Sequence, residues 1–185
     1  MENYTMNIIA PDFKHGSNIK IGSFIVIEEG VKVGDNVIVE NFSMIKKGAK
    51  IGNNVLIGTY SKIGKEVVVG NNVKMTSYVE IRDNCKVGDR STFGSRCTLS
   101  ADTIVEEDVI VKYGFVATDT PVLSSKEKKT CILKKGSRYG ANVVIMPAVI
   151  VGENSEIGAC SQLRSNVPDN EIWYGNPAKF YKKIR

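Results

Sequence analysis

Few residues of this 185-residue chain could act as a catalytic base or nucleophile. It contains one histidine, His15, and four cysteines, Cys85, Cys97, Cys131 and Cys160. A cysteine that attacks a substrate must lose its proton, which requires a neighbouring base or positive charge. Cys85 and Cys97 belong to a regular series of small residues, which favours packing over catalysis. His15 is badly placed to serve as a base, so we do not expect covalent cysteine chemistry.

Positive charge is the second chemical feature. The chain has 25 Lys and Arg against 20 Asp and Glu, a net charge of +5. Basic residues cluster at Lys126–Lys129, Lys134–Lys135 and Lys179–Arg185, where they form either a solvated surface or a site for the phosphates of a nucleotide or coenzyme. Without interleaved aromatic residues they do not predict nucleic-acid binding. Lacking a membrane-length apolar run or a signal peptide, the chain is expected to be soluble and cytoplasmic.

A period of six residues organises most of the chain. Sixteen successive positions of one phase are apolar: Ile21, Ile27, Val33, Val39, Ile45, Ile51, Ile57, Ile63, Val69, Met75, Ile81, Val87, Phe93, Leu99, Val105 and Val111. This period fits neither an α-helix nor the alternation of a strand. A short repeat of constant phase indicates a solenoid, in which stacked units share one core. A β-sandwich would instead interrupt the pattern with loops of variable length.

A second series indicates how many repeats make one coil. The fourth residue after each apolar position is small or β-branched, which suits a tight inner corner. Glycine recurs every eighteen residues, at Gly16, Gly34, Gly52, Gly70 and Gly88. Glycine and the Asn or Asp residues after it favour tight turns. We therefore predict an all-β, three-sided coil of three hexapeptides, with strands stacked ~4.8 Å apart.

The repeat breaks once and ends once. After Val111 the phase fails, and it returns at Tyr139 after a distance that is not a multiple of six. We predict one β-helix domain over residues 1–185, with coils at about 16–112 and 137–166. A loop at about 113–136 leaves the coil, and a short strand or helix at about 167–185 caps it. Such a long excursion from a rigid solenoid is usually functional.

Three features resemble a known family. They are the Ile-Gly repeats, the segment GANVVIMPAVIVG at 140–152 and the tail GNPAK at 175–179. Together they resemble the hexapeptide-repeat acyltransferases, and most of all the N-acetyltransferases of nucleotide-linked amino sugars. This resemblance implies a left-handed parallel β-helix that assembles as a homotrimer, with active sites between subunits. It also implies acetyl-coenzyme A as cosubstrate, with its pantetheine arm between two helices and the loop reaching the neighbour.

The missing loop histidine argues for an amine acceptor. Many family members that acylate hydroxyls use a histidine in or near the loop as general base, because a hydroxyl must lose its proton as it attacks. Here His15 and the loop differ by about six turns, or roughly 28 Å. A neutral amine attacks a thioester without prior deprotonation. The single histidine also excludes a γ-class carbonic anhydrase, which needs three zinc-binding histidines, and no metal is expected.

The resemblance implies a set of site residues. Asp102 and Asp119 would orient the amine or accept its proton. The residues that would bind the sugar nucleotide are Ser95, Arg96, Ser100, Tyr113 and Thr118. Those that would bind coenzyme A are Lys134, Lys135, Ala141, Asn142, Ala159, Arg164 and Lys179.

The predicted function is therefore coenzyme A-dependent N-acetylation of an amino sugar linked to dTDP or UDP. Within enzymes, the alternative is an O-acetyltransferase of a sugar or a xenobiotic, which the absent loop histidine disfavours. An alternative of another class is a non-catalytic β-helix scaffold subunit.

Overall fold

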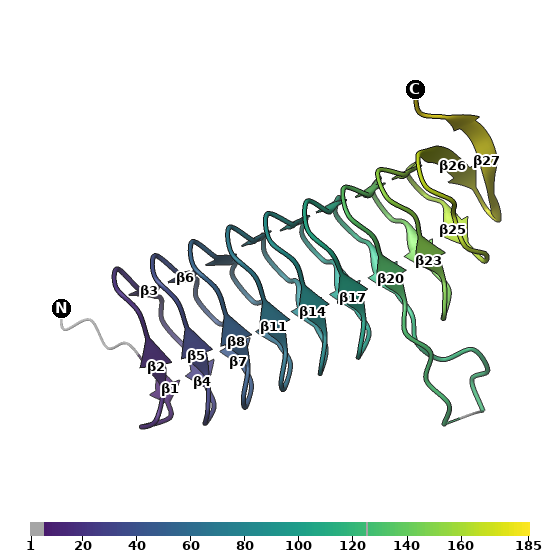
Figure 1. The fold of residues 1–185 in the computed structure, drawn as a ribbon. Helices are drawn as coiled ribbons and strands as arrows, with labels where there is room; N and C mark the ends of the chain where they lie inside the picture. Colours follow the sequence, from purple (N-terminus) through teal and green to yellow (C-terminus); the bar gives the residue numbers. More distant parts are fainter. Residues whose placement is uncertain (1–5, 125) are drawn as a thin grey trace.

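The computed structural model describes residues 6–124 and 126–185 as coils stacked along one axis (Figure 1). Each coil is triangular, because three two-residue strands alternate with three turns. Each strand pairs in parallel with the strand one coil away, as Lys50 and Ile51 do with Val68 and Val69. The three-sided parallel β-helix predicted from the sequence is therefore confirmed. Among the described residues, no helix is long and apolar enough to cross a membrane.

Two of the three faces are sheets of two-residue strands. Sheet A contains β1 (Ile8–Ile9), β4 (Val26–Ile27), β7 (Met44–Ile45), β10 (Lys62–Ile63), β13 (Glu80–Ile81), β16 (Thr98–Leu99), β19 (Val116–Ala117), β22 (Val144–Ile145) and β25 (Gln162–Leu163). Sheet B contains β2 (Lys14–His15), β5 (Lys32–Val33), β8 (Lys50–Ile51), β11 (Val68–Val69), β14 (Lys86–Val87), β17 (Ile104–Val105), β20 (Ile132–Leu133) and β23 (Ile150–Val151).

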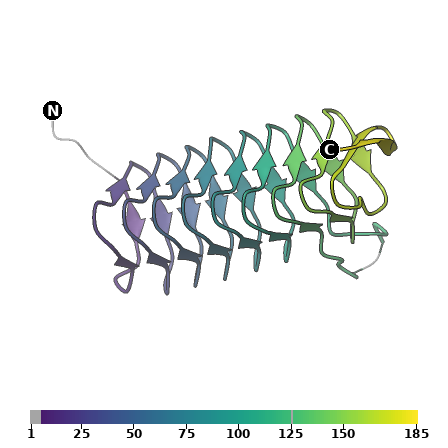
Figure 2. The same ribbon diagram turned by 45° about the horizontal axis from the view of Figure 1, so that its top comes forward.

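The third face carries the end of the chain. Sheet C contains β3 (Lys20–Ile21), β6 (Ile38–Val39), β9 (Leu56–Ile57), β12 (Lys74–Met75), β15 (Thr92–Phe93), β18 (Ile110–Val111), β21 (Arg138–Tyr139), β24 (Glu156–Ile157), β26 (Glu171–Gly175) and β27 (Ala178–Lys183). The last two strands form an antiparallel hairpin, whose β26 pairs in parallel with β24. This hairpin is the C-terminal cap, and it lies at the opposite end of the stack from β1 (Figure 2).

The two inward series form one continuous core. In the two-residue strands from β4 to β25 the second residue points inward, and the residue before the strand, which is small or β-branched except for Phe115, fills the neighbouring corner. Ile25 and Ile27 are buried in this way, as are Cys85 and Val87. Ser43 takes the same small position and donates a hydrogen bond to the Gly58 carbonyl, which satisfies its hydroxyl in the core. The predicted packing role of the small series is confirmed by this burial.

At each corner, residues of the same type stack on one another from coil to coil. At the corner between sheets B and C, Asn18, Asn36, Asn54 and Asn72 adopt left-handed φ angles of 55–57°. Each of the first three donates a side-chain hydrogen bond to the amide oxygen of the next, at 3.0–3.2 Å. Asparagine tolerates this conformation at lower cost than most residues do. The corner between sheets C and A instead carries an exposed aromatic column, Phe24, Phe42, Tyr60 and Tyr78, with neighbouring ring centroids 4.8–5.1 Å apart.

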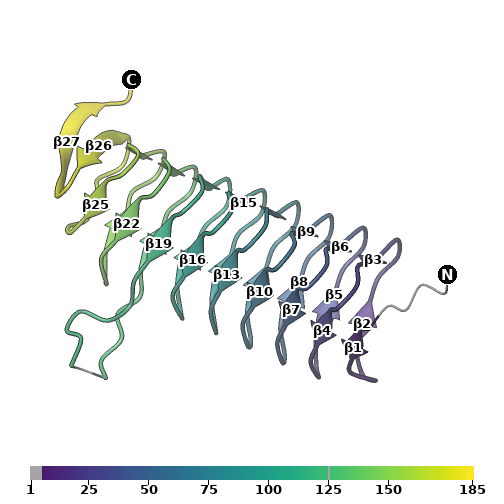
Figure 3. The same cartoon turned by 180° about the vertical axis from the view of Figure 1, so that it is seen from behind.

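The loop interrupts the corner between sheets A and B. It leaves after β19 and returns at β20 (Figure 3). Strand β17 pairs with β20, twenty-eight residues onward instead of eighteen, so ten residues are inserted. The loop is shorter than the 113–136 predicted from sequence, because Phe115, Ala117, Cys131 and Leu133 still fill inward positions. The coils also begin earlier than residue 16, since β1 already pairs with β4.

Candidate active site

A buried carboxylate lies where the loop leaves the coil. Asp119 is the second residue after β19, and only 7% of its surface is exposed. Its backbone carbonyl accepts a hydrogen bond of 2.8 Å from the amide of Lys129, which closes the base of the loop. Since loops that leave a rigid scaffold commonly carry functional residues, Asp119 is the natural starting point for a site.

The two carboxylate oxygens of Asp119 have different surroundings. Oδ1 accepts hydrogen bonds from the Thr120 hydroxyl at 2.8 Å and from Lys128 Nζ at 2.9 Å. Lys128 Nζ also donates to Thr120 Oγ1 at 2.7 Å. Oδ2 is buried and has no hydrogen-bond partner among the described residues. A buried carboxylate oxygen normally has a partner, so this one is open to a ligand that brings a donor.

These contacts determine the charge of the site. Burial acts to raise the pKa of Asp119, but the hydrogen bonds from Lys128 and Thr120 lower it. The positive charges of Lys128 and Arg82 lower it further, and the net pKa lies below the ordinary value. Asp119 is therefore an anion at neutral pH, suited to hold a cationic group.

The neighbouring thiol is not a nucleophile. Cys131 is buried beside this carboxylate, and its Sγ donates to the carbonyls of Thr118 and Met146 at 3.3 Å. Burial raises the pKa of the Cys131 thiol to about 11. Burial likewise raises the pKa of Cys85 to about 12 and that of Cys97 to about 11. These three thiols stay protonated and inert at neutral pH.

Four predicted residues come together at this corner. Because β16 pairs with β19, Ser100 and Asp102 lie one coil before Thr118 and Asp119. Ser100 is buried beside Thr103, and Thr118 Oγ1 donates to the Ile145 carbonyl at 2.8 Å. Asp102 adopts a left-handed φ of 63° in its turn and accepts a hydrogen bond from Asn84 Nδ2 at 3.1 Å.

The other predicted sugar-binding residues lie at a different corner. Ser95, Arg96 and Tyr113 are in the turns between sheets C and A, across sheet A from Asp119. Ser95 hydrogen-bonds to Thr76, and the Arg96 guanidinium lies 6.0 Å from the centroid of the Tyr78 ring. Tyr113 is exposed. The structure of one chain therefore separates the predicted sugar site into two groups.

The predicted coenzyme residues are also divided. Ala141 and Asn142 lie at the C–A corner one coil after Tyr113, and Ala159 lies at the same corner one coil further on. The amide of Asn142 donates to the Tyr113 carbonyl, and that of Cys160 donates to the Ala141 carbonyl.

The remaining predicted coenzyme residues carry charge elsewhere. Lys135 pairs with Glu107 at 2.9 Å and Lys134 approaches Asp169 at 3.9 Å, both at the B–C corner. Arg164 follows β25 on sheet A, where its Nε donates to Gln162, and Lys179 belongs to the cap. All seven lie in the coils after the loop or in the cap, but they do not form one cluster.

Two participants in the site were not predicted individually. Lys128 belongs to the basic cluster Lys126–Lys129, for which the sequence left open a solvated surface or a phosphate site, yet its ammonium contacts Asp119. Thr120 was not singled out. No spacing signal could have found these contacts, because the inserted loop has no repeat to fix its conformation. His15 lies on β2, which six successive pairings of sheet B separate from β20.

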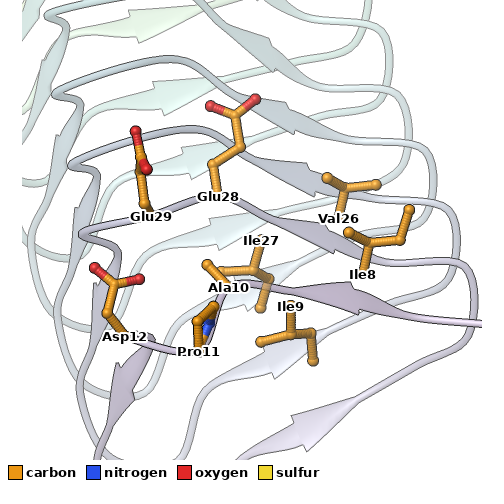
Figure 4. Close-up of a pocket in the computed structure, with 9 residues that line it drawn as sticks. All are labelled: Ile8, Ile9, Ala10, Pro11, Asp12, Val26, Ile27, Glu28 and Glu29. Carbon is orange, nitrogen blue, oxygen red and sulfur yellow. The ribbon is translucent and has the colours of Figure 1, made fainter.

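A hollow lies at the N-terminal end of the solenoid, away from Asp119. It is lined by apolar residues of β1 and β4 with Asp12, Glu28 and Glu29 at its edge (Figure 4). Asp12 accepts a hydrogen bond from the amide of Gly30, Glu28 accepts one from that of Lys47, and Glu29 pairs with Lys47 Nζ. These carboxylates therefore already stabilise the turns. No group of three or more metal-ligating side chains occurs among residues 6–124 and 126–185.

Comparisons with known proteins give a consistent fold. The model of the family described as the GMPPB C-terminal domain matches residues 34–137, more than half of the chain. The model described as the hexapeptide repeat of succinyl-transferase matches residues 16–42. Among solved structures, UDP-N-acetylglucosamine acyltransferase from Campylobacter jejuni superposes with a TM-score of 0.81 over 97% of this chain and 74% of that one, at 18% identity.

The names of the curated relatives specify different acceptor groups, a hydroxyl in one and an amine in the other. Galactoside O-acetyltransferase of Lactococcus lactis is 30% identical over 98 residues, 53% of this chain and 42% of the relative. The dTDP-3-amino-3,6-dideoxy-alpha-D-galactopyranose 3-N-acetyltransferase of Aneurinibacillus thermoaerophilus is 46% identical over 48 residues, 26% of this chain and 25% of the relative. The chain thus spans less than half the length of either relative.

Proposed function

The chain belongs to the hexapeptide-repeat acyltransferases and to the family of the GMPPB C-terminal domain, and we propose that it is a coenzyme A-dependent N-acetyltransferase. Its proposed acceptor is the amino group of a sugar linked to dTDP or UDP. The name of the Aneurinibacillus relative supports this substrate class, and the name of the Lactococcus relative keeps a hydroxyl acceptor as the second candidate.

The observation that carries the proposal is the buried carboxylate of Asp119 and its unpartnered Oδ2. An anion at this position attracts an ammonium group and orients its nitrogen. A hydroxyl acceptor would need a base whose pKa lies near neutrality. Asp119 is a poor base for that purpose, since its pKa is lowered, and the one histidine of the chain lies six coils away.

The proposed reaction has few steps. The ammonium group of the acceptor loses one proton to water, and its neutral nitrogen attacks the thioester carbonyl carbon of acetyl-coenzyme A. The carbon–sulfur bond then breaks, and the coenzyme leaves as a thiolate. The nitrogen of the new amide loses its second proton, which protonates the thiolate directly or through Asp119. Asp102, one coil away, is proposed as a second carboxylate that attracts the amine.

The remaining predicted residues have proposed binding roles. Ser95, Arg96 and Tyr113 would meet the sugar nucleotide together with Ser100 and Thr118. Because these two groups lie at different corners of one chain, a homotrimer would bring one corner of a subunit toward another corner of its neighbour. The coenzyme would lie along the coils after the loop. We place this activity in the cytoplasm, because the chain's buried thiols suit a reducing compartment.

The test is thiol release from acetyl-coenzyme A, with 3-amino and 4-amino sugars linked to dTDP or UDP as acceptors. Hydroxyl analogues of the same sugars are the matched controls. Release with one amine and not with its hydroxyl analogue is the expected result. Release with the hydroxyl analogue alone would establish the O-acetyltransferase instead. An absence of both release and stabilisation by acetyl-coenzyme A would favour a scaffold.

A further inference from the structure

The contacts of Lys128 define a site for a primary ammonium group. Its Nζ lies 2.9 Å from Asp119 Oδ1 and 2.7 Å from Thr120 Oγ1. Thr120 donates its own hydroxyl proton to Oδ1, so its oxygen is free to accept from the ammonium. The Asp119 carboxylate and the Thr120 hydroxyl thus accept two of the three hydrogen bonds that an –NH₃⁺ group can donate.

The two sides of this ion pair differ in burial. The Asp119 side chain is 9% exposed, whereas the Lys128 side chain is 50% exposed and belongs to the inserted loop. Because the Lys128 side chain is half exposed, water can solvate its ammonium when it leaves the carboxylate. The carboxylate cannot become exposed without moving the loop, and a buried charge without a partner is strongly unfavourable. The site therefore favours replacement of Lys128 by another cation.

The unpartnered oxygen indicates that the site is made for more than Lys128. Asp119 Oδ2 is buried, yet none of the described residues donates to it. A ligand that enters with its own donors could use this oxygen together with the position that Lys128 now occupies. A neutral hydroxyl could donate to Oδ2, but it has no charge with which to compete against a lysine for the carboxylate.

We propose that Lys128 is an internal occupant of the acceptor's ammonium subsite, and that an amino sugar displaces it. The identity of the displacing amine rests on the proposed function. The loop thus selects for amines before any chemistry occurs, because only a cation can exchange with Lys128. The exchange also lowers the apparent affinity of the chain for the amino sugar, because the state in which Lys128 has left Asp119 is populated for only part of the time.

The test compares Lys128→Met with the wild-type chain in binding, without acetyl-coenzyme A. The probes are dTDP- and UDP-linked 3-amino and 4-amino sugars and their hydroxyl analogues, titrated by calorimetry. Removal of the competing ammonium should tighten binding of the amino sugar at least about fivefold and leave the hydroxyl analogue unchanged. Lys126→Met is the matched control, because Lys126 lies in the same loop and makes no ion pair with a described residue. It should leave both affinities unchanged.

Other outcomes separate this inference from the proposed function. If Lys128→Met weakens the amino sugar and the hydroxyl analogue alike, Lys128 is only a structural support of the loop and the inference is wrong. Equal affinities in the variant and the wild type, or no binding of any amino sugar, would also overturn it. Thiol release by the wild-type chain decides the proposed function separately, because the binding titrations involve no acetyl transfer.

Discussion

Asp119 and Asp102 stand at the same corner in successive coils, yet their surroundings differ. Asp119 is buried with an unpartnered oxygen, whereas Asp102 accepts a hydrogen bond from Asn84 in an exposed turn. We expect Asp119→Asn to lower kcat/KM for an amine acceptor by about 10²-fold, because it removes the charge that holds the amine. Asp102→Asn should lower it by less than about threefold. Steady-state thiol release with melting curves of both variants measures this. A larger loss of kcat/KM in Asp102→Asn than in Asp119→Asn would indicate that the amine binds one coil closer to the N-terminus.

The four cysteines should differ sharply in reactivity. Cys85, Cys97 and Cys131 are buried, with pKa values raised to about 11–12 by burial, whereas Cys160 is exposed. We therefore expect iodoacetamide at neutral pH to modify one thiol per folded chain, at Cys160, and all four after denaturation. Peptide mass spectrometry identifies the modified sites. Rapid modification of Cys131 in the folded chain would show that the base of the loop opens readily.

At the residue scale, the sequence predicted the position of the carboxylate but not its partners. Asp119 became a candidate through the family resemblance, which implies a sugar site at the start of the loop, and not through a regular position of the repeat. Lys128 is nine residues away in a segment without periodicity, so its contact depends on a loop conformation that no repeat determines. The Lys126–Lys129 run was therefore interpreted only as a basic cluster.

The loop, as an element, should depend on the ionisation of Asp119. Its folded pKa is lowered, so the contact with Lys128 is present above the ordinary carboxyl pKa and is lost as the pH falls through the lowered value. In Lys128→Met, the raising effect of burial remains while the main lowering contact is absent. We expect carbon-13 NMR titration to give a pKa below the ordinary value in the wild-type chain and a higher one in the variant. Identical values in the two chains would show that Lys128 does not hold the carboxylate in solution.

The elements themselves were more predictable than the loop. The hexapeptides that combine one apolar and one small or β-branched residue form a strand and a turn, because such a pair fills the inside of the coil. The sequence nevertheless placed the loop boundaries too far apart. Ala117 and Leu133 occupy the inward positions at its two ends, but the inserted residues between them obscure the phase. The predicted cap became a hairpin on β24 that was not foreseen in detail.

At the scale of the whole molecule, the coils act as a sum of neighbouring contacts. The candidate site depends on the coils of β16, β19 and β22, whereas the aromatic column lies at the corner of four earlier coils. Stacking is specific to each corner, since asparagines bond to asparagines at the B–C corner and aromatic rings stack on aromatic rings at the C–A corner. The repeating unit of stability is therefore the eighteen-residue coil and not the hexapeptide.

A pair of deletions tests this distinction. Removal of residues 37–54 joins Asn36 to Val55 and takes out one whole coil, so each corner column continues with its own residue type. Removal of residues 43–54 joins Phe42 to Val55 and preserves the six-residue phase. It also places Phe42 at the position of Asn54, so the coils before the junction are rotated by one corner relative to those after it.

We expect the variant without residues 37–54 to lose less thermal stability than the variant without residues 43–54, although it lacks more residues. It should also keep acetyl transfer within about threefold of the full chain, because the deleted coil is remote from Asp119. Melting curves and thiol release measure both properties. Equal stability of the two variants would mean that the hexapeptide alone is the unit, and that the asparagine and aromatic columns contribute little.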